Sequence, residues 1–110
     1  MFENCTQLKS ITLPDSVTDI RTGAFAGCTS LESAVLGTGV AAIWDIAFMG
    51  CSSLKSIIIP DSVHYIGSQA FDGCSGLQSM TIGSGIVSFG SSCFRNCTGQ
   101  VTINGNIPDG

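Results

Sequence analysis

The chain has 110 residues, the size of one domain, and carries a net charge of −4 from four basic and eight acidic residues. The four Lys and Arg residues lie far apart, which excludes the clustered basic surface that nucleic-acid binding requires. Mean hydropathy is positive, yet no apolar run approaches the roughly 18 residues of a membrane span. The first residues also lack the basic and then apolar segments of a signal peptide.

The sequence repeats every 23 residues, which indicates a solenoid. Phenylalanine and cysteine each form a column at this spacing, the first at Phe2, Phe25, Phe48, Phe71 and Phe94, the second at Cys5, Cys28, Cys51, Cys74 and Cys97. Aliphatic columns follow at the same spacing: Leu8, Leu31, Leu54, Leu77; Leu13, Leu36, Ile59, Ile82; Val17, Val40, Val63, Ile86; and Ile20, Ile43, Ile66 with Phe89. Four full units and a shortened fifth form one predicted domain over residues 1–110, a fragment or the C-terminal part of a longer array.

In chain order, the first unit contains two short extended segments and a turn. In "LKSITLP", Leu8, Ile11 and Leu13 are predicted to point inward, and Pro14 ends the strand because it has no N–H for a ladder. "VTDI" is a second short strand. "GAFAGC" is predicted to be a single helical or 3₁₀ turn. Two strands in so short a unit cannot bury their own apolar face, so the units must stack.

The pattern L-x-x-I-x-[LI]-P-x-x-V-x-x-I-x-x-x-A-F-x-x-C resembles the BspA-type leucine-rich repeat of bacterial surface proteins over nearly the whole chain. The family glycine is kept at Gly67 and Gly90 but replaced by Arg21 and Trp44, and Gln100 occupies a leucine position in the last unit. The resemblance implies a right-handed leucine-rich-repeat solenoid. Its concave side is a parallel β-sheet of the "LxxIxI" segments, and its convex side holds the "VxxI" segments and the "AFxxC" turns.

The outward residues of the concave sheet are the default binding surface of such a solenoid. A serine column runs through the units beside a column of Lys, Glu and Gln, and neither contains an aromatic or Arg anchor. Protein binding and a merely solvated sheet face both fit this pattern. The candidate residues are Lys9, Ser10, Thr12, Glu32, Ser33, Val35, Lys55, Ser56, Ile58, Gln78, Ser79 and Thr81.

Trp44 is a secondary candidate, together with Tyr65 in the next unit. One interpretation is an exposed aromatic anchor for a partner. The other is a ring that lies above Gly67 and shields the convex strands.

Patterns that suggest chemistry have structural explanations here. The cysteine ladder is expected to be buried free thiols, with no disulfide and no zinc. "GTGVAA" at 37–42 matches a dinucleotide fingerprint, but the same columns hold Pro14-Asp15-Ser16 and Pro60-Asp61-Ser62 in the neighbouring units, so it is a repeat turn. His64 is the single histidine and lies in a variable column, so no catalytic arrangement, enzyme activity or cofactor is predicted.

The two turn types alternate, which makes a 46-residue period and suggests an ancestral duplication. Glycine permits positive φ and proline does not, so the two turns are expected to take different backbone paths. The turn aspartates Asp15, Asp61 and Asp72 are expected to bond local backbone.

The resemblance further implies a non-catalytic protein-interaction module of a cell-surface or secreted protein, engaged in adhesion or host-protein binding. The alternative is a structural spacer without a ligand. Apolar residues of the first unit would be exposed at an uncapped end, which suggests a homodimer through the N-terminal unit; these are Phe2, Leu8, Ile11 and Leu13.

Overall fold

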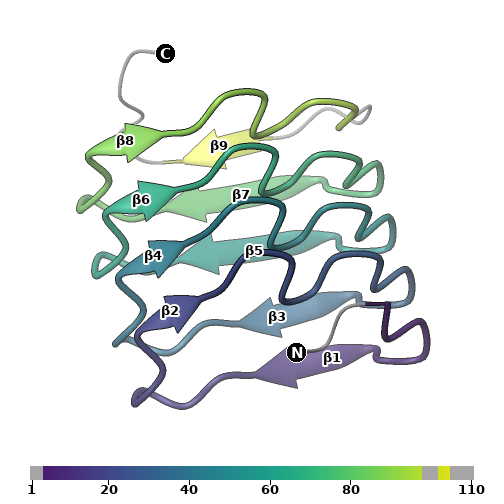
Figure 1. The fold of residues 1–110 in the computed structure, drawn as a ribbon, viewed down its shortest axis with the longest axis horizontal. Helices are drawn as coiled ribbons and strands as arrows, with labels where there is room; N and C mark the ends of the chain where they lie inside the picture. Colours follow the sequence, from purple (N-terminus) through teal and green to yellow (C-terminus); the bar gives the residue numbers. More distant parts are fainter. Residues whose placement is uncertain (1–3, 98–101, 105–110) are drawn as a thin grey trace.

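The 23-residue unit forms one rung of a β-solenoid, and successive rungs stack along one direction (Figure 1). The computed structural model describes residues 4–97 and 102–104. The five-stranded sheet comprises β1 (Ser10–Thr12), β3 (Ser33–Val35), β5 (Ser56–Ile59), β7 (Ser79–Ile82) and β9 (Thr102–Asn104). The four-stranded sheet comprises β2 (Asp19–Ile20), β4 (Ala42–Ile43), β6 (Tyr65–Ile66) and β8 (Ser88–Phe89).

Every strand pair is parallel and joins equivalent residues of adjacent rungs. Ser10 lies opposite Ser33 and Ser33 opposite Ser56 in the five-stranded sheet. In the four-stranded sheet, Ile20 lies opposite Ile43. The strands of the two sheets run in opposite directions across the molecule (Figure 1). The predicted leucine-rich-repeat solenoid is therefore confirmed, with the "VxxI" segments forming a complete second sheet.

The core lies between the two sheets and consists of the columns predicted to point inward. Phe25, Phe48 and Phe71 are at most 3% exposed, and their rings stack with centroids 5.2 and 5.3 Å apart. Phe94 continues the stack at 6.0 Å. The aliphatic columns of the middle rungs are equally buried, at Leu31, Leu54, Leu77, Val40, Val63, Ile43 and Ile66.

The first and last rungs pack less completely than the middle ones. Leu8, Ile11, Leu13 and Val17 are half-buried, although their equivalents in the second rung are buried. The edge of the solenoid leaves one side of these residues without a neighbouring rung. Phe2 and Gln100, on which two expectations about the chain ends rested, lie outside the described residues.

The "GAFAGC" segment forms a chain of tight turns, and no helix occurs in residues 4–97 or 102–104. Alternate N–H groups bond within the segment, as from Ala26 to the carbonyl of Gly23. The N–H groups between them bond to the next rung, as from Phe25 to the carbonyl of Ala47. This alternation repeats in the second and third rungs and makes a third ladder along the solenoid, so a continuous helical hydrogen-bond pattern cannot form.

Two columns of this segment have positive φ. Gly27, Gly50 and Gly73 have φ of 76–80°, and Asn4 and Asn96 occupy the same column at 59° and 62°. Glycine and asparagine are the residues that tolerate this left-handed conformation best. The second column is less selective, because it contains Gly23, Ile46, Gln69 and Ser92. The left-handed residues lie in this segment, and the glycines of the "GTG" turns do not use the positive φ that glycine permits.

The glycines of the "GTG" turns serve close packing instead. A Cβ at Gly39 would overlap with the carbonyl oxygen of Asp15 in the rung below, and one at Gly85 would overlap with that of Asp61. The Asp15 carboxylate in turn accepts a hydrogen bond from the Thr38 N–H at 2.9 Å. Asp15 and Asp61 therefore bond the backbone of the next rung, and Asp72 bonds neighbouring side chains, whereas all three were expected to bond the backbone of their own turn.

Candidate functional site

The five-stranded sheet brings the predicted concave residues together on one outward face. Ser10, Ser33, Ser56 and Ser79 lie opposite one another in register and form a serine ladder. Beside it runs a second outward column in the same register: Thr12, Val35, Ile58 and Thr81. All these residues are exposed except Ser79, which is half-buried. Because side chains alternate across a strand, the residues between them point into the core.

Val35 and Ile58 form an apolar pair at the centre of this face. They are directly opposite each other on β3 and β5 and are 56% and 66% exposed. The sheet surface is hollowed beside them by a cavity of about 250 Å³ lined by residues 33–36 and 56–58. Single exposed apolar residues are ordinary, but two adjacent β-branched side chains in a frame of hydroxyl groups offer a defined contact for a partner.

The remaining candidates border the serine ladder. Glu32 donates its backbone N–H to the carbonyl of Lys9 at 2.7 Å, and Gln78 donates to that of Lys55 at 2.8 Å, so the four residues form a continuous column. All four side chains are exposed. Within the part of the chain that the structure describes, none of them forms an ion pair. The charges of Lys9, Glu32 and Lys55 are therefore available to a partner.

Trp44 and Tyr65 lie on the outer side of the four-stranded sheet, away from the serine ladder. Their rings are 5.5 Å apart and inclined at 55°. The indole Nε1 donates a hydrogen bond to Asp19 Oδ1 at 3.0 Å, and the side chain is still 41% exposed. Gly67 has no room for a Cβ, which would lie 2.6 Å from the carbonyl carbon of Trp44. The Trp44 ring is therefore held by Tyr65 and Asp19 and keeps an exposed surface.

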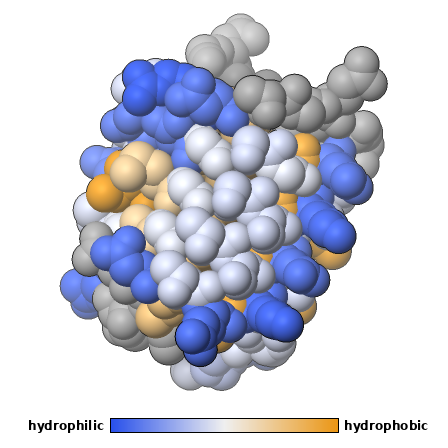
Figure 2. Space-filling model, turned by 90° about the vertical axis from the view of Figure 1, so that its right-hand side faces the viewer, coloured by the Kyte–Doolittle hydropathy of each residue, from blue (hydrophilic) through white to orange (hydrophobic). Residues whose placement is uncertain are grey.

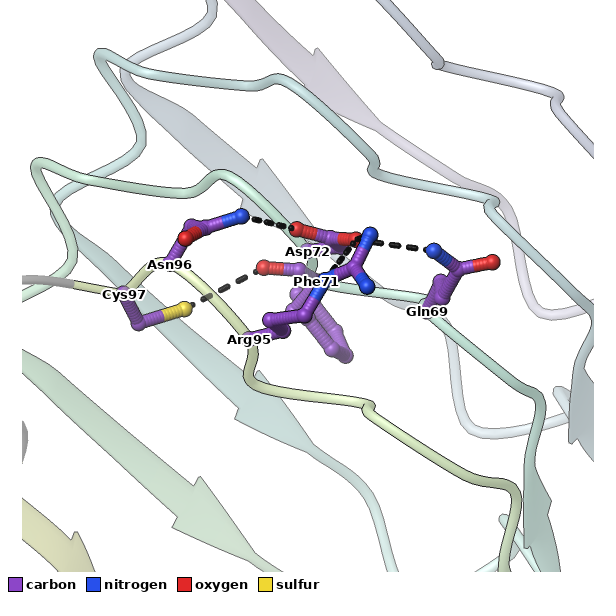
Figure 3. Close-up of polar contacts among 6 residues, drawn as sticks. All are labelled: Gln69, Phe71, Asp72, Arg95, Asn96 and Cys97. Atoms are coloured by element: carbon purple, nitrogen blue, oxygen red, sulfur yellow. Dashed lines mark hydrogen bonds and ion pairs between the residues drawn. The ribbon is translucent and has the colours of Figure 1, made fainter.

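Asp72 anchors a polar cluster that sequence reasoning missed (Figure 3). Its carboxylate accepts hydrogen bonds from Gln69 at 2.9 Å and Asn96 at 3.2 Å, and it forms an ion pair with Arg95 at 3.0 Å. Burial acts to raise the pKa of Asp72, but the hydrogen bonds from Gln69 and Asn96 and the Arg95 charge outweigh it and lower the pKa. Asp72 and Arg95 occupy one column in adjacent rungs, a spacing that could have revealed the pair.

The structure shows no disulfide among the six cysteines, and the predicted burial holds for the middle of the ladder, whereas Cys5 and Cys97 at its ends are half-buried. Cys51 and Cys74 donate S–H hydrogen bonds to the carbonyls of Phe25 and Phe48 in the rung below, at 3.1 and 3.2 Å. Burial raises the pKa of Cys51 to about 12 and that of Cys74 further, so neither thiol is a nucleophile near neutral pH. These cysteines are core residues that satisfy buried carbonyl groups.

Other residues that could carry chemistry are dispersed. His64 is exposed, and its Nδ1 lies 2.9 Å from the carbonyl oxygen of Gly85. Residues 4–97 and 102–104 contain no group of three or more His, Cys, Asp or Glu that could hold a metal ion. Over the same residues, no helix has the length and apolar character needed to cross a membrane.

The turn side of the solenoid offers little to a partner. Figure 2 shows this side, where residues of intermediate hydropathy cover the centre and strongly hydrophilic residues follow the right-hand edge. The exposed and half-buried turn residues here are small and uncharged: Thr29, Ser30, Ser52, Ser53, Ser75 and Gly76. The outward face of the five-stranded sheet therefore remains the stronger candidate.

Comparisons with known proteins agree with this architecture. Residues 1–107 match the family model described as "BspA type Leucine rich repeat region" in six copies. A leucine-rich repeat protein of T. pallidum is 36% identical, with a TM-score of 0.85 over 87% of this chain and 45% of its own. A leucine rich cell surface protein of Faecalibacterium prausnitzii is 38% identical, with a TM-score of 0.71 over 74% of this chain and 21% of its own.

The pneumococcal vaccine antigen PcpA is 29% identical, with a TM-score of 0.79 over 96% of this chain and 27% of its own. The chain thus spans less than half the length of each of these three proteins. A search of curated proteins finds no match.

Proposed function

Because the chain belongs to the BspA-type leucine-rich repeat family, we propose that it is a non-catalytic protein-interaction module of a bacterial surface or secreted protein. It binds a host or other extracellular protein and so contributes to adhesion. The binding surface is the outward face of the five-stranded sheet. Two similar proteins support the proposed location at the cell surface or outside the cell, since one is described as a cell surface protein and another as a vaccine antigen.

The exposed Val35–Ile58 pair is the observation that carries this proposal. A partner side chain that covers both residues would remove apolar surface from water, at about 25 cal/mol per Å². The serine ladder beside them supplies hydrogen-bonding groups, and Lys9, Glu32 and Lys55 supply unpaired charges at the border. An apolar centre with a polar rim is the usual composition of a protein interface.

The test is a pair of matched substitutions on opposite sides of the solenoid. Ile58→Asp places a charge in the apolar centre, and Val87→Asp places one at a 73% exposed valine beside β8 in the other sheet. Both variants and the parent chain are applied to an array of purified extracellular-matrix and cell-surface proteins. We expect Ile58→Asp to weaken binding at least tenfold and Val87→Asp to leave it unchanged.

A second variant controls for the possibility that Ile58→Asp loses binding because the strand is destabilised. Val35→Thr with Ile58→Thr makes the column threonine from β1 to β7, because Thr12 and Thr81 already occupy its positions on β1 and β7. This variant keeps β-branched residues throughout the strands and should also lose binding. A parent chain that binds no protein on the array contradicts the proposal and favours the spacer alternative. Equal loss in the Val87→Asp variant also contradicts it, because binding would not depend on the five-stranded sheet.

A further inference from the structure

A second surface, on the outer side of the four-stranded sheet, has the features of a small-ligand site. It is an open hollow of about 550 Å³ lined by Asp19, Arg21, Thr22 and Trp44. Such a volume lies within the usual range of ligand sites. Asp19 lies on β2, Arg21 and Thr22 follow that strand directly, and Trp44 follows β4 in the next rung, so adjacent rungs build the hollow together.

The aromatic wall of this hollow is held in place before any ligand arrives. The Trp44 Nε1 bonds to Asp19 Oδ1 at 3.0 Å on one side, and the Tyr65 ring packs at 5.5 Å from the indole. Asp19 is itself held, because its Oδ2 accepts a hydrogen bond from the Thr18 hydroxyl at 3.0 Å. A fixed aromatic surface that is 41% exposed can bind a ligand without a further loss of side-chain entropy.

The polar groups around the indole combine one acceptor with several donors. The hydrogen bond from Trp44, followed by that from Thr18, lowers the pKa of Asp19, so its carboxylate is ionised and accepts hydrogen bonds. Arg21 presents guanidinium donors, and it forms no ion pair with any described residue. Thr22 can both donate and accept. Because Asp19 and Arg21 carry opposite charges, neither a simple anion nor a simple cation is favoured overall, and the mixture of acceptor and donors matches a neutral ligand with several hydroxyl groups.

We propose that this hollow binds a neutral sugar ring. The C–H face of a pyranose is apolar and weakly positive, and it suits the negatively polarised face of an indole. Ring hydroxyl groups would donate to Asp19 and accept from Arg21, with Thr22 serving either role. The sugar site lies on the opposite sheet from Val35 and Ile58, so it is separate from the proposed protein-binding face.

Tryptophan fluorescence tests this directly, because Trp44 is the single tryptophan of the chain. The chain is titrated with three neutral disaccharides, namely lactose, mannobiose and N,N′-diacetylchitobiose. We expect at least one to change the emission of Trp44 in a saturable way at millimolar concentration. Glucuronate and tetramethylammonium, which carry the excluded charges, should give at least tenfold weaker responses.

Substitutions locate the site. Arg21→Ala should weaken the sugar response at least fivefold, whereas Val87→Ser, outside the hollow, should leave it unchanged. Trp44→Phe, followed by calorimetry, should weaken binding while the circular dichroism spectrum stays that of the parent. Ile58→Asp should bind sugar normally, which separates this proposal from the protein-binding one. A titration in which none of the three sugars alters the emission overturns the inference, as does a stronger response to either charged probe or full binding by folded Trp44→Phe.

Discussion

At the scale of single residues, backbone conformation explains which positions of the repeat are restricted. The column before each cysteine has positive φ in every described rung and contains only Gly or Asn. By contrast, the column of Ile46 has positive φ although isoleucine is β-branched, at 51°. Such a residue is a true outlier in this region, so the hydrogen bonds between rungs must impose the conformation.

Gly50 allows this restriction to be measured. Its φ is 77°, and an added Cβ would have its nearest contact 3.7 Å away, which is ordinary packing. Gly50→Ala should therefore cost only the left-handed penalty, about 1–2 kcal/mol of the free energy of unfolding. Gly50→Asn should cost less, because Asn4 and Asn96 occupy this column. Urea unfolding measures both values, and equal losses would show that the cost is steric.

Asp72 should make stability depend on pH in the acid range. Its pKa in the folded chain lies below the ordinary 3.8, so its stabilising effect is complete above that value and is lost as pH falls through the folded-state pKa. Asp72→Asn should cost about 1 kcal/mol at pH 7, since Arg95 is largely exposed and its ion pair is screened.

The difference from the parent chain should shrink as the pH of thermal unfolding experiments is lowered below 3.8. Glu32→Gln is the control, because Glu32 is exposed and has no ion pair among the described residues. A loss of stability in Asp72→Asn that stays the same at every pH would show that the charge is not responsible.

At the scale of elements, the alternating turns are complementary parts of a two-rung unit. The Asp61 carboxylate accepts from the Ser84 N–H at 2.8 Å, as Asp15 does from Thr38. In the other direction, the Ser62 hydroxyl donates to the carbonyl of Val40 at 2.7 Å. The side chains of the "PDS" turn form both hydrogen bonds, and the glycines of the "GTG" or "GSG" turn leave room for the backbone of the "PDS" turn to approach closely. This complementarity of adjacent turns is a physical cause of the 46-residue period.

Exchanging the turns should reveal this asymmetry. Replacing residues 37–39 by Pro-Asp-Ser would place side chains against the carbonyl oxygens of Pro14 and Asp15, and overpacking of this kind costs about 1–3 kcal/mol at each position. Replacing residues 60–62 by Gly-Ser-Gly loses two side-chain hydrogen bonds, about 1 kcal/mol each. Chemical denaturation compares the two variants. The complementary model is contradicted if the first is the more stable.

The sequence was sufficient to predict much at this scale, but not all of it. The columns identified the strands and the inward residues, because burial of an apolar face depends on periodicity. The helical turn was not confirmed, since the alternating hydrogen bonds of the "GAFAGC" segment depend on the next rung. For the same reason, the positive φ of Gly50, the close contact at Gly39 and the Asp72 cluster were not foreseen. On the candidate face, the 23-residue register was enough to predict that Val35 lies beside Ile58. The hollow beside Trp44 could not be predicted in this way, because its shape depends on where the side chains lie.

At the scale of the whole molecule, each rung pairs only with its neighbours in the described sheets. Stability in such a solenoid is approximately a sum of rung and interface contributions. The middle rungs are buried on both sides and the first is half-buried. The chain should therefore open from its ends before its centre.

The rates at which the cysteines of the ladder are alkylated can measure how easily each rung opens. Cys5 is half-buried, whereas Cys28, Cys51 and Cys74 are buried. With iodoacetamide at pH 8, Cys5 should react first, and Cys51 should react at the rate of global unfolding because its thiolate is scarce and shielded. Mass spectrometry of peptides from timed samples measures each rate. Alkylation of Cys51 as fast as Cys5 would contradict the gradient.

The half-buried first rung also bears on assembly. A mainly apolar hollow of about 130 Å³ lies at this rung, and it shares Asp19 and Arg21 with the hollow beside Trp44; its other lining residues are Leu13, Val17, Ile20, Ala24 and Phe25. When the 110-residue chain is prepared by itself, we expect a second copy to cover this hollow and form a homodimer through the N-terminal rung. Light scattering should show a mass that rises toward the dimer with concentration, and Leu13→Glu should prevent the rise. A monomeric mass at high concentration contradicts the prediction.

The cross-rung hydrogen bonds of the two sheets and of the "GAFAGC" segment all join one rung to the next, so they have a mechanical consequence. Tension applied between the first and last rungs pulls along these bonds, and all interfaces bear the same force because the rungs are in series. The interfaces would then separate one at a time, beginning with the weakest. Each 23-residue rung that detaches would release about 75 Å of extended chain, at about 3.3 Å per residue. We therefore expect the chain to lengthen under load in steps of one rung.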